Sequence, residues 1–245
     1  MEKAVKEFLK STYYENLSPS DQSQEKPAPS MINQPENIIE SFKLLNPKEL
    51  NLPEKNIFNL LENRRTRRAY SNSLLNKNDL SLLLYYTQGI KKTLSDGRNM
   101  RTVPSAGARH PFETYFYLNK SEELPTGLYY YNPLEHKILL INNQDLTEEL
   151  IEGAIGQKFI KEAAATFCWV ANYSRTAWRY SERSFRYIHL DGGHLCQNLY
   201  LVAEALNYGV CAIAAYDDEK MNKLLKLNSN DRFVAYMASL GGQKK

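Results

Sequence analysis

The chain has 245 residues, which is enough for one sizeable hydrophobic core or two small ones. Its composition (42% hydrophobic, 11% aromatic, 24% charged) is ordinary for a globular protein, and its net charge of +3 is too small for a dedicated nucleic-acid-binding protein. No run of about 18 uncharged apolar residues occurs and the N-terminus lacks a signal-peptide pattern, so we expect a cytoplasmic protein with no membrane partner.

The N-terminal part differs in composition from the rest of the chain. Residues 18–39 are polar and rich in proline, so they cannot bury enough apolar surface to form a core. We therefore interpret residues 1–56 as a short helix followed by an extended arm, which lies on the globular part or on a partner. Residues 57–245 are expected to form the globular domain.

The first half of this domain mixes helical and strand patterns. Asn78-Asp79 is an N-cap signal for a helix that ends at Gly89. Short aromatic or β-branched runs then predict strands at 113–118, 128–131 and 137–141, with Asn132-Pro133 as the turn of a hairpin between the last two.

The second half continues in the same way. Asp145 caps a predicted helix over LTEELIEGAIG, and the apolar run 165–173 has the length of a buried strand. Two further buried strands, 210–216 and 233–240, flank a helix around 218–226.

One long helix is predicted before the last two strands. Its apolar residues recur on one helical face, and Gly209 is expected to end it; these residues are Leu195, Leu199, Val202 and Leu206. The fold class that follows is α+β, with helices on the faces of a central sheet. The cysteines Cys168, Cys196 and Cys211 lie in apolar segments without C-x-x-C spacing, which predicts buried thiols and no metal site.

The most unusual local feature is the run Arg64-Arg65-Thr66-Arg67-Arg68. Four guanidinium groups repel one another unless an anion or several carboxylates neutralise them, and Glu62 is the only acidic residue close in sequence. A phosphate site, a solvated basic face and a nucleic-acid contact all remain open for this run. No G-x-G-x-x-G or P-loop pattern offers another phosphate site.

Several motifs follow this run in a fixed order: PSAGARHPFETYFYL, GLYYYNP, GQKFIKEAAATFCWVAN, RYSERSFRYIHLDGGHLCQNL and VCAIAAYDD. Together with NRRTRRAY they resemble the nitroreductase family of FMN enzymes over residues 57–242. The chain is most similar to the SagB-type dehydrogenases, which oxidise azoline rings in ribosomal peptides. The resemblance implies a nitroreductase-like central mixed sheet flanked by helices, in an obligate homodimer with FMN at the subunit interface.

The resemblance assigns the arginine run to the cofactor. Arg64, Arg65 and Thr66 would bind the FMN phosphate and ribityl chain, and Arg68 would point to the pyrimidine side of the flavin ring. A cation there stabilises the anion that forms when flavin accepts a hydride. Arg67 is expected to face away from the cofactor.

Further cofactor contacts follow from the same resemblance. Pro104, Ser105, Ala106 and Gly107 match a P-S-x-x loop that reaches FMN from the second subunit, although the residues also suit an ordinary tight turn. Gln157 matches the amide that pairs with the flavin pyrimidine edge; without the family it is a surface glutamine.

The C-terminal third is expected to complete the cofactor site. The backbone of Ala212, Ile213, Ala214 and Ala215 matches the segment in which an N–H donates to flavin N5, and Ala214 is the best choice for this donor. An ordinary core strand would have a similar sequence. Lys244 or Lys245 would add a second cation to the phosphate, unless the terminus is frayed.

For catalysis, Arg179-Tyr180 stands where SagB-type azoline oxidases have a Lys-Tyr pair. Arginine does not lose its proton at accessible pH, so a neutral amine base is in doubt here. Tyr180 would act as acid or base with Arg179 beside it, or would simply pack beside a surface arginine. His194, in a Gly-His pair expected to open the long helix, is assigned a local hydrogen bond.

Three functions are compatible with these observations. The first is an FMN dehydrogenase that oxidises azoline-like rings of a modified peptide or a small molecule. The second is a reductase of nitro compounds or quinones that uses NADH or NADPH by ping-pong chemistry. The third is a peptide- or nucleic-acid-binding protein without catalytic activity.

Overall fold

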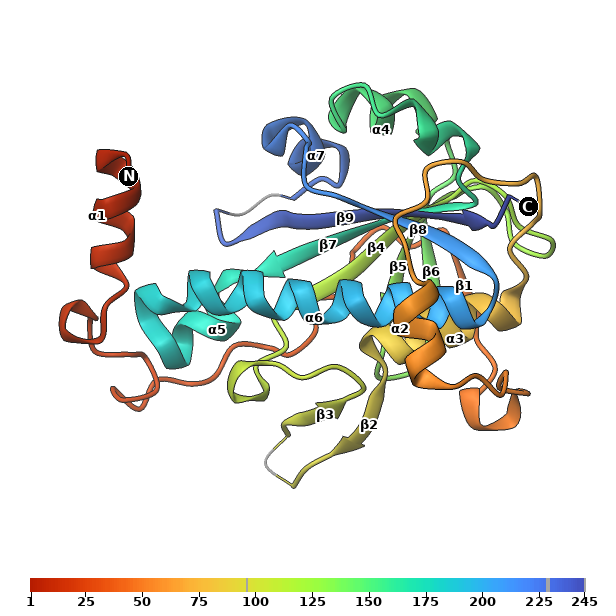
Figure 1. Cartoon of the computed structure of the whole chain (residues 1–245). Coiled ribbons are helices and arrows are strands. Elements are labelled where there is room, and N and C mark those ends of the chain that lie inside the picture. Colours follow the sequence, from red (N-terminus) through yellow and green to blue (C-terminus); the bar gives the residue numbers. More distant parts are fainter. Residues whose placement is uncertain (96, 228–229, 245) are drawn as a thin grey trace.

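The computed structural model describes residues 1–95, 97–227 and 230–244 and has the predicted α+β architecture (Figure 1). Its central sheet has seven strands in the order β1-β6-β5-β4-β7-β9-β8, and all six neighbouring pairs are antiparallel. Among the described residues, parallel pairing occurs in two isolated bridges, Thr66 with Val210 and Leu75 with Ser121. The strands are β1 (Glu40–Lys43), β4 (Phe112–Leu118), β5 (Gly127–Asn132), β6 (Lys137–Asn142), β7 (Ala165–Asn172), β8 (Tyr208–Ile213) and β9 (Arg232–Gly242).

Helices cover both faces of the sheet (Figure 1). One core cluster joins the sheet to α3 and α6, and a second joins the opposite face to α4 and α7. A separate hairpin of β2 (Ile90–Thr93) and β3 (Asn99–Arg101) projects below the sheet in this view. The helices are α1 (Lys3–Ser11), α2 (Ile57–Asn63), α3 (Lys77–Gln88), α4 (Thr147–Gly153), α5 (Tyr173–Tyr180), α6 (Ser184–Ala205) and α7 (Asp218–Leu224).

The predicted strands and the β5–β6 hairpin are confirmed, except that β8 ends at Ile213 and not at residue 216. Both β4 and β7 are buried at every residue, as continuous apolar runs between two covered faces should be. The three cysteines are buried and unpaired, as expected. Within the described residues, no helix has the length and apolar character needed to cross a membrane.

Some predicted boundaries were wrong. The N-cap of α3 is Asn76, whose Oδ1 accepts a hydrogen bond from the Asp79 N–H at 2.8 Å, rather than Asn78-Asp79. The long helix α6 ends at Ala205, and Gly209 lies inside β8. Asn207, with φ of 62°, makes the reversal between them that was assigned to glycine.

The start of α6 was also misplaced. The helix begins at Ser184, ten residues before His194, which is therefore an exposed residue in mid-helix instead of one at its N-terminus. The apolar periodicity over 195–206 covers the half of α6 that supplies most of its residues to the core cluster with α3, while the first half supplies Ile188. The first half of α6 is more polar and shows no apolar repeat in the sequence, so it was not predicted as helix. Tertiary contacts alone decide which of its residues are buried.

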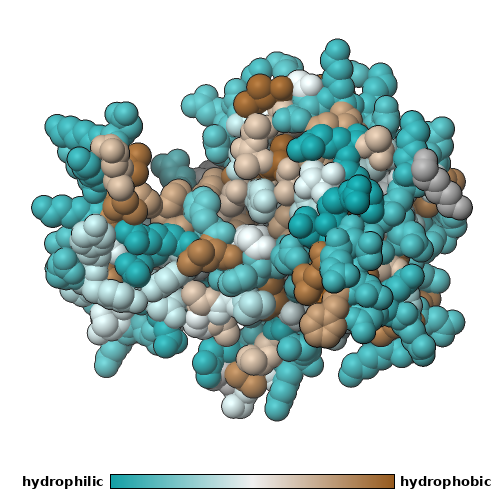
Figure 2. Space-filling model, viewed as in Figure 1, coloured by the Kyte–Doolittle hydropathy of each residue, from teal (hydrophilic) through white to brown (hydrophobic). Residues whose placement is uncertain are grey.

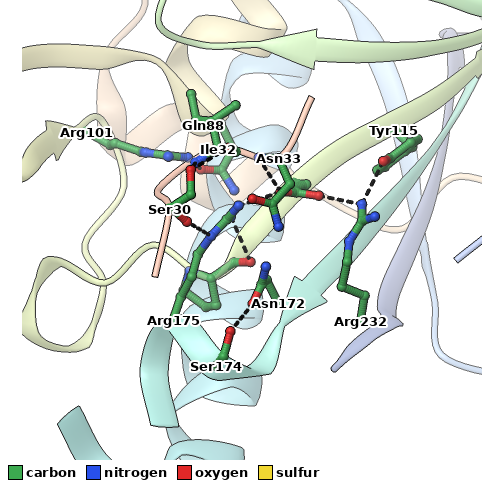
Figure 3. A network of polar contacts seen from close by, with 12 residues as sticks. Ser30, Ile32, Asn33, Gln88, Arg101, Tyr115, Asn172, Ser174, Arg175 and Arg232 are labelled. Carbon is green, nitrogen blue, oxygen red and sulfur yellow. Dashed lines mark hydrogen bonds and ion pairs between the residues drawn. The ribbon is translucent and has the colours of Figure 1, made fainter. Parts of the chain in front are cut away.

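The N-terminal arm lies on the globular part. It contributes β1, which pairs with β6 at the edge of the sheet, and the Gln22 N–H donates to the Trp178 carbonyl at 2.7 Å. Figure 3 shows the buried network that fixes its middle. The Arg175 Nε donates to the Ser30 carbonyl at 2.8 Å, and the Asn33 N–H donates to the Glu113 carboxylate at 3.1 Å.

The centre of this network is the carboxylate of Glu113 on β4. It pairs with Arg175 of α5 and with Arg232 of β9, at N–O distances of 2.5 Å and 2.6 Å. The Arg175 side chain is fully buried, so its charge depends on this carboxylate. The network therefore ties the arm, α5 and the centre of the sheet together.

Candidate functional site

The arginine run lies alongside β8. Thr66 forms a bridge with Val210, and the Arg67 N–H donates to the Val210 carbonyl at 2.9 Å. Arg67 turns its side chain to Glu204 of α6, with an N–O distance of 3.3 Å, and packs on Gly209, where a Cβ would lie 2.8 Å from the Arg67 Cδ. Arg67 thus holds the run against the domain.

Tyr200 of α6 joins the run to the predicted N5 segment. Its hydroxyl accepts a hydrogen bond from the Ala212 N–H at 2.9 Å and lies 3.2 Å from the Thr66 Oγ1. The Arg64 guanidinium lies over its ring, 5.3 Å from the centroid. Tyr200 was not predicted as a site residue, although a buried tyrosine beside Leu199 on an apolar helix usually finds a polar partner for its hydroxyl.

The rest of this first group continues past the end of β8. Ala214 and Ala215 follow the strand and are exposed, while Ile213 is buried in the core below them. Burial raises the pKa of the Cys211 thiol, and nearby Arg68 acts in the opposite direction. Arg68 is therefore beside β8, close to the AIAA segment.

A second group forms around the predicted P-S-x-x loop, over Pro104–Gly107. The Ser105 Oγ donates to the Asp191 carboxylate at 2.6 Å, and the Ala106 N–H donates to the same carboxylate at 3.2 Å. Burial raises the pKa of Asp191, with the bond from Ser105 as the main opposing influence. Asp191 was not predicted, although a lone acid between apolar residues on a helix is a detectable signal.

The loop continues in an unusual backbone conformation. Gly107, Ala108 and His110 all have positive φ, at 56°, 52° and 45°. The Ser105 Oγ also accepts a hydrogen bond from the His110 N–H at 2.9 Å, which closes the loop on itself. Left-handed conformations cost energy at non-glycine residues, so this loop is held in place by its surroundings.

The Arg179–Tyr180 pair packs directly on this loop. A Cβ at Gly107 would lie 2.6 Å from the Tyr180 hydroxyl and 3.0 Å from the Arg179 Cδ, so only glycine permits the contact. The Tyr180 ring meets Tyr187 edge-on at 4.8 Å, while the Arg179 guanidinium lies 5.7 Å from the Tyr180 ring centroid. The structure therefore brings the predicted loop and the predicted catalytic pair together within one chain.

The two groups lie at different parts of α6. Asp191 and Tyr200 are two and a half turns apart, which is about 13 Å at ~1.5 Å per residue and places them on opposite sides of the helix. Lys244 belongs to the end with the arginine run, because the preceding Gln243 bonds to Glu204 at 3.2 Å. Lys245 lies outside the described residues.

Gln157 is separate from both groups. It precedes the short 3-10 helix at Lys158–Glu162 and follows α4, which covers the face of the sheet opposite α6. One chain does not bring Gln157 to the arginine run or to the Pro104–Gly107 loop. Among the described residues, no three or more His, Cys, Asp or Glu side chains are grouped as a metal site.

Comparison with known proteins identifies the family. The nitroreductase family model matches residues 61–242, and the chain belongs to this family of oxidoreductases. The nitroreductase-family protein MJ1384 of Methanocaldococcus jannaschii is 36% identical over 182 residues, which are 73% of this chain and 90% of that protein.

One further relative and one solved structure of the same fold are also similar to the chain. The trifolitoxin-processing protein TfxB of Rhizobium leguminosarum bv. trifolii is 30% identical over 138 residues, covering 52% of this chain and 36% of TfxB. A chain of the Escherichia coli microcin synthetase McbBCD complex, solved with truncated pro-MccB17 bound, has the same fold with a TM-score of 0.62 and 17% identity. That likeness covers 100% of this chain and 95% of the other.

Proposed function

We propose that the chain is an FMN-dependent oxidoreductase that works as a homodimer with the cofactor at the subunit interface. The arginine run fits a phosphate. Arg67 is neutralised by Glu204, whereas Arg64, Arg65 and Arg68 have no carboxylate partner in the part of the chain that the structure describes. Guanidinium groups in this arrangement match phosphate oxygens in a bidentate manner.

The separation of the two groups supports the homodimer. In an isologous dimer, a two-fold axis near the middle of α6 would bring the arginine run of one copy to the Pro104–Gly107 loop of the other. The free side of α6 is suitable for this packing, since Leu190 is 61% exposed and a Cβ at Gly193 would meet nothing within 4 Å. Apolar residues also interrupt the polar surface across the middle of the molecule, where α6 faces the viewer (Figure 2).

The residues around this interface have distinct tasks. Bound FMN would supply a hydride acceptor, with oxygen as the final oxidant. Ala214 offers a backbone N–H at the edge of this site, and Arg68 provides a positive charge next to it. Tyr180, in its phenolate form, would accept the proton that the substrate loses, and Arg179 would lie beside it as a cation that cannot itself act as a base.

We assign an azoline-like ring of a modified peptide or small molecule as the group that is oxidised. The observation that carries this assignment is the packing of Arg179–Tyr180 on Gly107, where SagB-type enzymes have their Lys-Tyr pair. TfxB and the microcin synthetase complex add support, since one is named a trifolitoxin-processing protein and the other was solved with truncated pro-MccB17 bound. The likeness to the microcin synthetase chain also takes in the N-terminal arm.

An NADH- or NADPH-dependent reductase of nitro compounds or quinones is the second candidate. The identity with MJ1384 favours it, because that protein is named a nitroreductase and is covered over 90% of its length. Both candidates use the same cofactor site, so the electron donor distinguishes them.

Two measurements test these proposals. Purified protein should be yellow or should bind added FMN, and a colourless protein that binds no FMN would refute both candidates. Anaerobic mixing with NADH or NADPH should then leave the flavin oxidised in an azoline dehydrogenase, whereas rapid bleaching would identify the reductase.

The residue assignments are tested by variants of the arginine run. Arg64→Ala should weaken FMN binding about tenfold or more, since it removes a charge-assisted contact worth about 1.5–3 kcal/mol. Arg68→Ala should mainly lower the reduction potential of the bound flavin. Lys161→Ala, on the opposite face of the sheet, is the control; FMN affinity that is unchanged in Arg64→Ala would misplace the phosphate.

A further inference from the structure

Arg109 lies near the Arg179–Tyr180 pair, and both residues of the pair act electrostatically on it. Arg109, at the end of the Pro104–Gly107 loop, is only 4% exposed, and its Nε donates to the Arg175 carbonyl at 2.7 Å. Its guanidinium stacks on the Trp178 ring at 4.7 Å from the centroid. The Nη2 atom is buried and has no hydrogen-bond partner among the described residues.

Several other arginines lie close enough to Arg109 to act on its charge. Arg179, Arg175 and Arg98 all act electrostatically on Arg109 and, after burial, are causes of its lowered pKa. Arg175 is paired with Glu113. In residues 1–95, 97–227 and 230–244, by contrast, no carboxylate pairs with Arg109 or Arg179.

The carboxylates on adjoining elements are already occupied. Glu113 pairs with Arg175 and Arg232, and Asp191 accepts its bonds from the Pro104–Gly107 loop. Glu182 accepts from the Ser18 hydroxyl at 2.6 Å and from the Ser18 N–H at 3.1 Å. A guanidinium pair beside a buried, unsatisfied donor is therefore left for a group from outside the chain.

We propose that Arg109 and Arg179 form an oxyanion-binding site next to Tyr180, which holds a carboxylate or phosphoryl group of the molecule that reacts there. Arginine donates two parallel hydrogen bonds to either group, and the Trp178 ring forms an apolar wall beside it. This inference rests on the proposed function and names the chemistry of its ligand. A carboxylate would come from an acidic peptide substrate, and a phosphoryl group from a dinucleotide electron donor.

The test is calorimetric titration of FMN-saturated protein at low salt with two probes, glutarate and inorganic pyrophosphate. At least one probe should bind saturably, and Arg179→Gln should weaken that binding about tenfold or more. Arg109→Lys keeps the charge but loses the planar fork, so it should give a smaller loss. Lys161→Gln, a surface lysine on the other face, should bind as the wild type does.

The outcomes separate the two sources and the two proposals. Preference for glutarate assigns the site to a peptide carboxylate, and preference for pyrophosphate assigns it to a dinucleotide. The proposal is overturned if neither probe binds, or if both arginine variants bind as tightly as the wild type. FMN binding is measured separately, by absorbance. If the protein is colourless, the same titration is made on the Arg64→Gln variant, where it still tests Arg109 and Arg179.

Discussion

Replacing Glu113 by glutamine removes one negative charge from the buried network and keeps the shape of the side chain. Arg175 is fully buried and Arg232 is largely buried, so both cations lose their counter-charge in a region with little water. Breaking a buried ion pair from one side costs about 3–5 kcal/mol. For a chain of this length that corresponds to a decrease of about 6–20 °C in Tm.

The assay is thermal and urea unfolding followed by circular dichroism, together with limited proteolysis. The arm should become more accessible to protease, because the Asn33 N–H and the Ser30 carbonyl both bond within this network. The matched control is Glu152→Gln, which breaks the exposed Glu152–Lys220 pair and should leave Tm unchanged within error. If Glu113→Gln unfolds like this control, the buried network does not stabilise the fold as inferred.

Three further variants test the two groups around α6. Burial lowers the pKa of His110 to about 3, so between pH 3 and 6.5 the folded state binds fewer protons than the unfolded state. The free energy of unfolding should therefore keep its full value above pH 6.5 and fall by about 2 kcal/mol from pH 7 to pH 5. His110→Asn should remove this loss, which urea unfolding at the two pH values measures. Tyr200→Phe leaves the Ala212 N–H without its acceptor, so it should lower the free energy of unfolding by about 1–3 kcal/mol and weaken FMN binding. An unchanged FMN dissociation constant would exclude Tyr200 from organising the cofactor site. Gly107→Ala places a Cβ against the Tyr180 hydroxyl at a positive φ, so it should lower the free energy of unfolding by about 1–2 kcal/mol and reduce turnover. A variant with wild-type Tm and turnover would contradict the packing of Tyr180 on Gly107.

Local patterns in the sequence were sufficient for most of the sheet. The runs that became β4, β5, β6 and β7 are continuous apolar or aromatic segments of strand length, and these form strands wherever two faces are covered. The strand β1 was not predicted because it has four mostly exposed residues and exists only through its pairing with β6. The helix α5 was missed for a related reason, as its buried Arg175 and Thr176 belong to the polar network and not to an apolar stripe.

The composition and order of the motifs determined the family, the α+β class and the candidate residues, since these depend on residue types and spacing along the chain. Only the tertiary structure decided which of those residues meet. It placed Arg179–Tyr180 on Gly107, turned Arg67 toward Glu204, and put the arginine run and the Pro104–Gly107 loop on opposite sides of α6. Asp191 and Tyr200 acquire their roles from contacts with residues 85 and 134 positions away, and no local pattern encodes contacts at that separation.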